Sequence, residues 1–96
     1  MENYSYLVLS PGQFTDSLSL NKHFVYGMNS FFYNIPFKYI YDDDQWVSIQ
    51  YQRGRMFAMY LQHKYPCQTF NNWEIGYFNE SARQDMYDAI NIGAIL

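Results

Sequence analysis

The chain is short of charge, of cysteine and of long apolar runs, and each shortage excludes a class of protein. Its single cysteine, Cys67, cannot form an internal disulfide, which fits a reducing compartment. Six basic residues and a net charge of −3 do not provide the basic surface of a duplex DNA binder. No apolar run approaches the roughly 20 residues of a membrane span, and Met1–Tyr4 lacks the basic start of a signal peptide. We therefore expect a cytoplasmic protein that has no membrane partner.

The residues that carry catalysis or bind metals are equally scarce. His23, His63 and Cys67 are the only soft ligands, and Pro66 breaks any helix that would align the last two. Cys67 with either histidine as its base would be a nucleophile, but no motif supplies an oxyanion hole or an orienting acid. We therefore expect a protein that is not an enzyme and that has no catalytic residue, metal or cofactor.

Aromatic residues are abundant instead. The eight Phe, eleven Tyr and two Trp outnumber the six basic and nine acidic residues together, although ordinary domains are about one quarter charged. Tyr and Trp suit surfaces that are both wet and adhesive. The sequence is also rich in residues with AT-rich codons, such as Phe, Tyr, Asn and Ile. A small, motif-free protein of this composition is typical of a phage or mobile-element accessory protein.

The sequence predicts a single α+β domain over residues 1–96, in which two helices accompany an antiparallel meander sheet of three to five strands. The first half supplies a strand at Tyr4–Leu9 and then a long helix. Apolar residues at helical spacing place this helix from about residue 14 to 33 and allow a break at Leu20-Asn21. Pro36 ends it, because the residue before a proline avoids the helical region.

The second half supplies the rest of the sheet and a terminal helix. An apolar period of two predicts strands at Phe37–Tyr41, Gln45–Tyr51, Met56–Leu61 and Trp73–Phe78. Turns are expected at Asp42–Asp44 and Arg53-Gly54. Asn79 should cap the terminal helix, with Ala82, Met86, Ala89, Ile90 and Gly93 on one face. The helices are expected to pack on the sheet through Leu18, Val25, Met28, Phe32, Met86, Ala89 and Ile90.

Both faces of the predicted sheet are apolar. With these turns, one face carries Ile40, Val47, Ile49, Tyr51, Met56, Ala58 and Tyr60. The other carries Phe37, Tyr39, Tyr41, Trp46, Phe57, Met59 and Leu61. Two arrangements fit this pattern. Either helices cover both sides of the sheet, or they cover one side and leave an aromatic patch larger than monomers usually expose.

The exposed patch leads to the principal functional hypothesis, a small non-enzymatic protein-binding module, with a homodimer favoured. It would inhibit or sequester a host protein, such as a component of a defence system, in the host cytoplasm if the chain is phage-encoded. The expected partner contacts are Phe37, Tyr39, Tyr41, Trp46, Phe57 and Met59, with Asp42, Asp43 and Asp44 at the rim. The acidic run either docks a basic patch of the partner or forms a solvated turn.

Two alternatives remain. Arg53–Tyr60 resembles in part the aromatic octapeptide of RNA-recognition-motif domains, because it opens with a basic residue and glycine, and has Phe57 fifth and Tyr60 eighth. In that family such rings stack on bases from the sheet surface, so the resemblance implies a single-stranded nucleic-acid binder. Its candidate contacts are Arg53, Arg55, Lys38 and Lys64. The other alternative is a small structural protein that self-assembles beyond a dimer.

Overall fold

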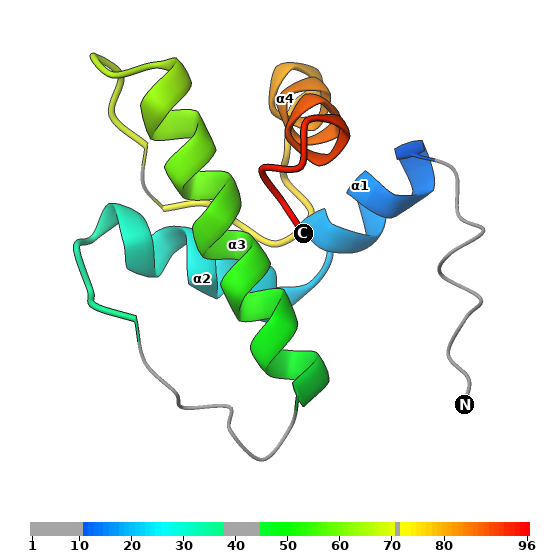
Figure 1. The fold of residues 1–96 in the computed structure, drawn as a ribbon, viewed down its shortest axis with the longest axis horizontal. Helices are drawn as coiled ribbons and strands as arrows, with labels where there is room; N and C mark the ends of the chain where they lie inside the picture. Colours follow the sequence, from blue (N-terminus) through cyan, green and yellow to red (C-terminus); the bar gives the residue numbers. More distant parts are fainter. Residues whose placement is uncertain (1–10, 38–44, 71) are drawn as a thin grey trace.

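The computed structural model describes residues 11–37, 45–70 and 72–96, with side chains from residue 15 onward. These ranges contain the helices α1 (Pro11–Ser19), α2 (Lys22–Phe32), α3 (Gln45–Lys64) and α4 (Glu80–Asn91), shown in Figure 1. Helices α2 and α3 cross and form the most extensive helix contact, while α1 packs against α2 and α4. No strand occurs in these ranges. The predicted α+β fold is therefore wrong, and the described part of the chain is all-α.

The main error concerns α3, which replaces the predicted strands Gln45–Tyr51 and Met56–Leu61 and the turn between them. Its buried residues recur every three or four positions, as on one side of a helix: Gln50, Tyr51, Gly54, Phe57, Ala58 and Leu61. Helix α3 also carries apolar residues that are exposed, among them Trp46, Ile49 and Met59. Because apolar residues lie on more than one side of α3, the sequence shows an alternating pattern and not a clear helical period.

Gly54 marks a close crossing of two helices and not a turn. A Cβ atom on Gly54 would overlap the Phe24 carbonyl group of α2, and one on Gly27 would overlap the Tyr51 carbonyl oxygen of α3. Each helix therefore presents a glycine to the backbone of the other. Only a residue without a side chain permits this approach, which also brings Phe24 and Phe57 together with ring centroids 6.0 Å apart.

The predicted helix from about 14 to 33 is two helices, α1 and α2, which separate at the allowed break. The Asn21 side chain accepts hydrogen bonds from the backbone N–H groups of His23 and Phe24, so it caps a new helix and stops the first from continuing. Asn34, with a φ of 62°, ends α2. The Ile35 N–H then bonds the Ser30 carbonyl, as expected of a Schellman motif.

The terminal helix is confirmed, with Asn79 as its cap and Asn91 as its last residue. Gly93 lies beyond the end of α4, with a φ of 80°, where it turns the chain back. The residues predicted to pack against a sheet form a core between helices instead. Five are buried, namely Leu18, Val25, Met28, Met86 and Ala89, and two are partly buried, namely Phe32 and Ile90.

The described residues between α3 and α4, 65–70 and 72–79, form no strand, so the strand predicted at Trp73–Phe78 is also wrong. The Asn29 side chain donates to the Trp73 carbonyl oxygen (3.0 Å) and accepts from the Trp73 N–H (2.9 Å). A side chain of α2 thus satisfies the backbone groups that a neighbouring strand would have satisfied. The predicted strand at Tyr4–Leu9 lies outside the described residues. The predicted strand at Phe37–Tyr41 also lies outside them, except for Phe37.

Candidate functional site

The outer side of α3 borders an apolar hollow of about 470 Å³, which we call the α3 groove. Four of its lining residues belong to α3 and two to the segment that follows α4. They are Met56, Met59, Tyr60, His63, Ile92 and Ala94. Most of these side chains are apolar, and methionine adapts its shape to different apolar neighbours. The chemistry of the groove is therefore that of a contact surface.

Residues 92–96 form the second wall of the α3 groove, and the turn at the end of α4 holds them in position. The Ala94 N–H bonds the Ala89 carbonyl oxygen (2.8 Å), which folds the chain back beyond Gly93. Ile95 then enters the core, while Arg53 of α3 donates from Nε to the Leu96 carbonyl oxygen (2.6 Å). In Figure 1 this segment, drawn in red, runs back from α4 toward α3. Both walls of the α3 groove are thus fixed by the fold.

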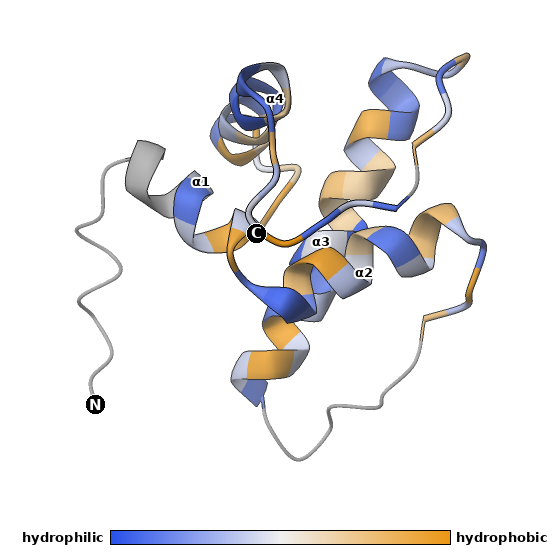
Figure 2. Cartoon of the chain, turned by 180° about the vertical axis from the view of Figure 1, so that it is seen from behind, coloured by the Kyte–Doolittle hydropathy of each residue, from blue (hydrophilic) through white to orange (hydrophobic). Residues whose placement is uncertain are grey.

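Exposed apolar side chains extend this surface along α3. Met59 is 55% exposed, Ile49 is 38% exposed and Trp46 is 48% exposed. Ile92 and Leu96 are also largely exposed. Figure 2 shows hydrophobic residues recurring along the length of α3. An apolar groove that is bordered by exposed apolar side chains suggests an interaction surface.

The residues that the sequence predicted as partner contacts are separated by the fold. Met59 lines the α3 groove and Trp46 lies exposed on the same helix, but Phe57 is completely buried in the core. Phe37 is exposed, and its ring packs against Tyr51 at 5.5 Å. The other predicted contacts lie outside the described residues: Tyr39, Tyr41, Asp42, Asp43 and Asp44.

Sequence reasoning missed two parts of the groove. Met56 was assigned to the opposite face from Met59, although the two lie three positions apart in a helix and therefore share a side. For Ile92 and Ala94 the sequence offers one local signal, the glycine between them. A glycine after a helix favours a reversal of the chain, which here brings both residues to the groove. Reading α3 as a helix would have found the first part.

The described basic residues that were predicted to contact nucleic acid make hydrogen bonds within the fold. Arg53 binds the Leu96 carbonyl oxygen, and Arg55 donates to the Ile35 carbonyl oxygen (2.8 Å). The Arg55 guanidinium also lies 5.7 Å from the Phe31 ring centroid. Lys38 lies outside the described residues. The segment that resembles the RNA-recognition octapeptide is part of α3 and not a strand, so its rings do not form a stacking surface on a sheet.

Lys64, the remaining candidate, joins α3 to α4. Its Nζ donates to Asp85 Oδ1 (2.7 Å), and the hydroxyl of Tyr65 donates to Asp85 Oδ2 (2.8 Å). The hydrogen bond to Asp85 raises the pKa of Lys64 above its ordinary value of 10.5. A hydrogen bond to the same carboxylate raises the pKa of Tyr65 above its ordinary value of 10.0. Both groups therefore hold their protons more tightly in the folded chain.

These raised pKa values predict a loss of stability in alkaline solution. A group with a raised pKa in the folded state stabilises the fold fully below its ordinary pKa, and this contribution disappears as the pH rises. We expect the urea midpoint to fall from about pH 10 upward. The Asp85→Asn variant should be less stable at neutral pH and should show a flatter alkaline decline. Parallel pH curves for the two proteins would contradict this role of Asp85.

The described residues hold no group of three or more His, Cys, Asp or Glu side chains that could bind a metal ion. Cys67 is exposed in the loop after α3, and His63 lies at the α3 groove. Within the same described ranges, no helix has both the length and the apolar character needed to cross a membrane.

No protein-family model, no curated protein and no solved structure matches this chain. The functional argument therefore rests on the physical character of the α3 groove and its surroundings.

Proposed function

We propose that this chain is a small, non-enzymatic protein-binding module whose α3 groove holds the apolar face of an amphipathic helix from a partner protein. The apolar α3 groove, flanked by the exposed side chains of Met59 and Ile92, is the observation that carries the proposal. A helix that inserts apolar residues from successive turns into such a groove is a common mode of peptide recognition. Met56 and Met59 supply flexible side chains that adjust to the inserted residues.

The distribution of charge favours a partner helix with basic flanks. The described residues carry five acidic and five basic side chains, and two of the basic ones form ion pairs, Lys64–Asp85 and Arg83–Asp16. The net charge of −3 therefore comes from the remaining residues, chiefly Asp42–Asp44, which directly precede α3 in the sequence. A partner with basic residues beside its apolar face would complement this charge, with a greater effect on association rate than on affinity.

Such binding would cover the partner's helix. It would thereby inhibit or sequester a host protein. The proposed origin in a phage or mobile element is supported by size and composition alone. Homodimer formation is the competing use of the α3 groove, because a second copy would cover the same apolar side chains. The nucleic-acid alternative loses support, since Arg53, Arg55 and Lys64 are engaged within the fold.

The test compares two synthetic amphipathic helices with the same apolar face, one with lysine and one with glutamate on the polar face. We expect the lysine peptide to bind the wild type, as measured by fluorescence anisotropy. Met59→Asp should weaken that binding at least about tenfold, or about 1.4 kcal/mol. Gln62→Asp is the matched control, because it adds the same charge at an exposed position of α3 that does not line the groove.

Three results would contradict the proposal. One is that neither peptide binds, and another is that Met59→Asp binds as well as Gln62→Asp does. The third comes from light scattering on the wild type. A dimer that Met59→Asp dissociates would assign the α3 groove to self-association.

A further inference from the structure

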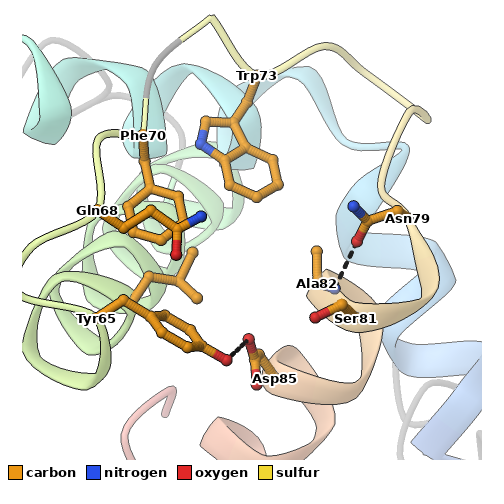
Figure 3. Close-up of a pocket in the computed structure, with 9 residues that line it drawn as sticks. Tyr65, Gln68, Phe70, Trp73, Asn79, Ser81, Ala82 and Asp85 are labelled. Carbon is orange, nitrogen blue, oxygen red and sulfur yellow. Dashed lines mark hydrogen bonds between the residues drawn. The ribbon is translucent and has the colours of Figure 1, made fainter.

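A second hollow, of about 320 Å³, lies between the end of α3, the loop that follows it and the start of α4. We call it the α4 pocket, and Figure 3 shows its lining. Its volume is at the lower end of the range for small-molecule sites. Its residues are distinct from those of the α3 groove.

The loop wall of the α4 pocket is held in place before any ligand arrives. Trp73 is fixed by its paired hydrogen bonds with the Asn29 side chain. The Gly76 N–H bonds the Ser19 carbonyl oxygen (2.8 Å). The Phe70 ring stacks on Phe32, with ring centroids 5.3 Å apart. The loop is therefore attached to α1 and α2 at separate points, and the pocket is preformed.

One side of the pocket is a wall of aromatic rings. Phe70 and Trp73 stack with an interplanar angle of 23° and centroids 6.2 Å apart, and Tyr65 lies 6.0 Å from Phe70. Trp73 and Phe70 both line the hollow. Aromatic rings that line a cavity favour a planar ligand, which packs well against them.

The other side carries hydrogen-bonding groups. In Figure 3 the side chains of Gln68 and Ser81 are directed into the space between the loop and α4. The Asn79 Oδ1 atom accepts from the Ala82 N–H (2.8 Å), so its amide N–H₂ group is the part left to donate to a ligand. Gln68 and Ser81 each offer both a donor and an acceptor. A ligand here needs donors and acceptors along its edge.

The acidic residue that lines the α4 pocket is neutralised by an ion pair within the fold. Asp85 lines the pocket and is only 6% exposed, and its carboxylate is neutralised by Lys64 at 2.7 Å. The Tyr65 hydroxyl occupies the second oxygen. An anionic ligand would meet this carboxylate, and a cationic ligand would compete with Lys64. An uncharged ligand suits the site best.

We propose that the α4 pocket binds a free nucleobase or nucleoside, an uncharged planar nitrogen heterocycle whose edge carries both N–H donors and carbonyl or ring-nitrogen acceptors. The ring stacks on Phe70 and Trp73. Its polar edge bonds Gln68, Ser81 and Asn79. This site is separate from the partner-binding groove, so the Met59→Asp variant binds the heterocycle as the wild type does.

The experiment is a ¹H–¹⁵N NMR titration of the full chain with adenosine, guanosine, cytidine and uridine. We expect saturable shifts of the Trp73 indole N–H and the Gln68 side-chain amide for at least one nucleoside. The indole N–H of Trp46, an exposed residue outside the α4 pocket, is an internal control and should not move. Gln68→Leu should weaken binding at least about tenfold, whereas Gln62→Leu, an exposed glutamine outside the pocket, should leave it unchanged.

Four outcomes would overturn the proposal. The first is the absence of saturable shifts with every nucleoside, and the second is unchanged affinity in Gln68→Leu. The third is equal affinity for benzyl alcohol, which has the ring but not the polar edge. The fourth is binding only of a single-stranded oligonucleotide with steep salt dependence, because that pattern belongs to phosphate contacts.

Discussion

Replacing Gly54 by alanine is expected to destabilise the protein, although alanine is the better helix former. In an ordinary helix interior this change stabilises by roughly 0.5–1 kcal/mol. Here the added methyl group would overlap the Phe24 carbonyl group at the crossing of α2 and α3. The two helices must move apart, and forced overpacking of this kind costs about 1–3 kcal/mol or more. We expect a net loss of about 2 kcal/mol, which reverses the usual sign.

Urea unfolding followed by circular dichroism measures this change. Gly93→Ala is the control, because an added Cβ atom at Gly93 meets open space. The loss of stability in this variant, about 1–2 kcal/mol, therefore arises from the positive φ of the backbone alone. Gly27→Ala should behave as Gly54→Ala does. The double variant should lose less than the two single losses combined, since one separation of the helices relieves both overlaps. A stabilised Gly54→Ala variant would show that the helices do not cross at this glycine.

Phe57→Ala and Met59→Ala should have very different effects, although the two residues are only two positions apart. Phe57 is completely buried, so its truncation leaves a cavity and costs about 3–5 kcal/mol. Met59 is 55% exposed, and its truncation should change stability by no more than about 0.5 kcal/mol. In a strand the two side chains would share a face, whereas in α3 they point to different sides.

The free energies of unfolding of the two variants therefore distinguish helix from strand without a further structure. Met59→Ala should also weaken binding of the lysine peptide while the fold remains intact. Similar destabilisation by both substitutions would contradict the helical register of α3. A stable Phe57→Ala variant that loses the peptide would instead restore Phe57 as a contact residue.

Local signals predicted the ends of helices and much of the core. Asn79 is followed by a helical apolar pattern, and Pro36 follows the end of α2, so both boundaries could be placed from neighbouring residues alone. The buried positions Leu18 and Met86 were found because their helices have polar residues on the opposite side. Where one side of a helix is polar, periodicity identifies the buried side.

Long-range packing decided the elements that were predicted wrongly. Gly54 favours a turn on local grounds, and its role appears only when Phe24 of a different helix is placed against it. The outer side of α3 adds Ile49 and Met59, which remove the polar side that would have revealed the helix. The same exposed residues that suggest an interaction surface therefore concealed the secondary structure.

The candidate groove was foreseen only in part. The sequence indicated an exposed apolar surface that includes Trp46 and Met59, and both are exposed in the structure. It could not join Met59 to Ile92, because the reversal after Gly93 and the Arg53–Leu96 bond bring together residues distant in sequence. The α4 pocket had no local signal, since Gln68, Ser81 and Asp85 meet only when the loop docks.

The paired hydrogen bonds between Asn29 and Trp73 also bear on aggregation. Trp73–Phe78 is an aromatic segment with the composition of a strand, and such segments recruit other chains when their backbone groups are free. The Asn29 amide occupies both the N–H and the carbonyl of Trp73. Helix α2 thereby withholds the first residue of this segment from intermolecular pairing, while the Trp73 ring still lines the α4 pocket.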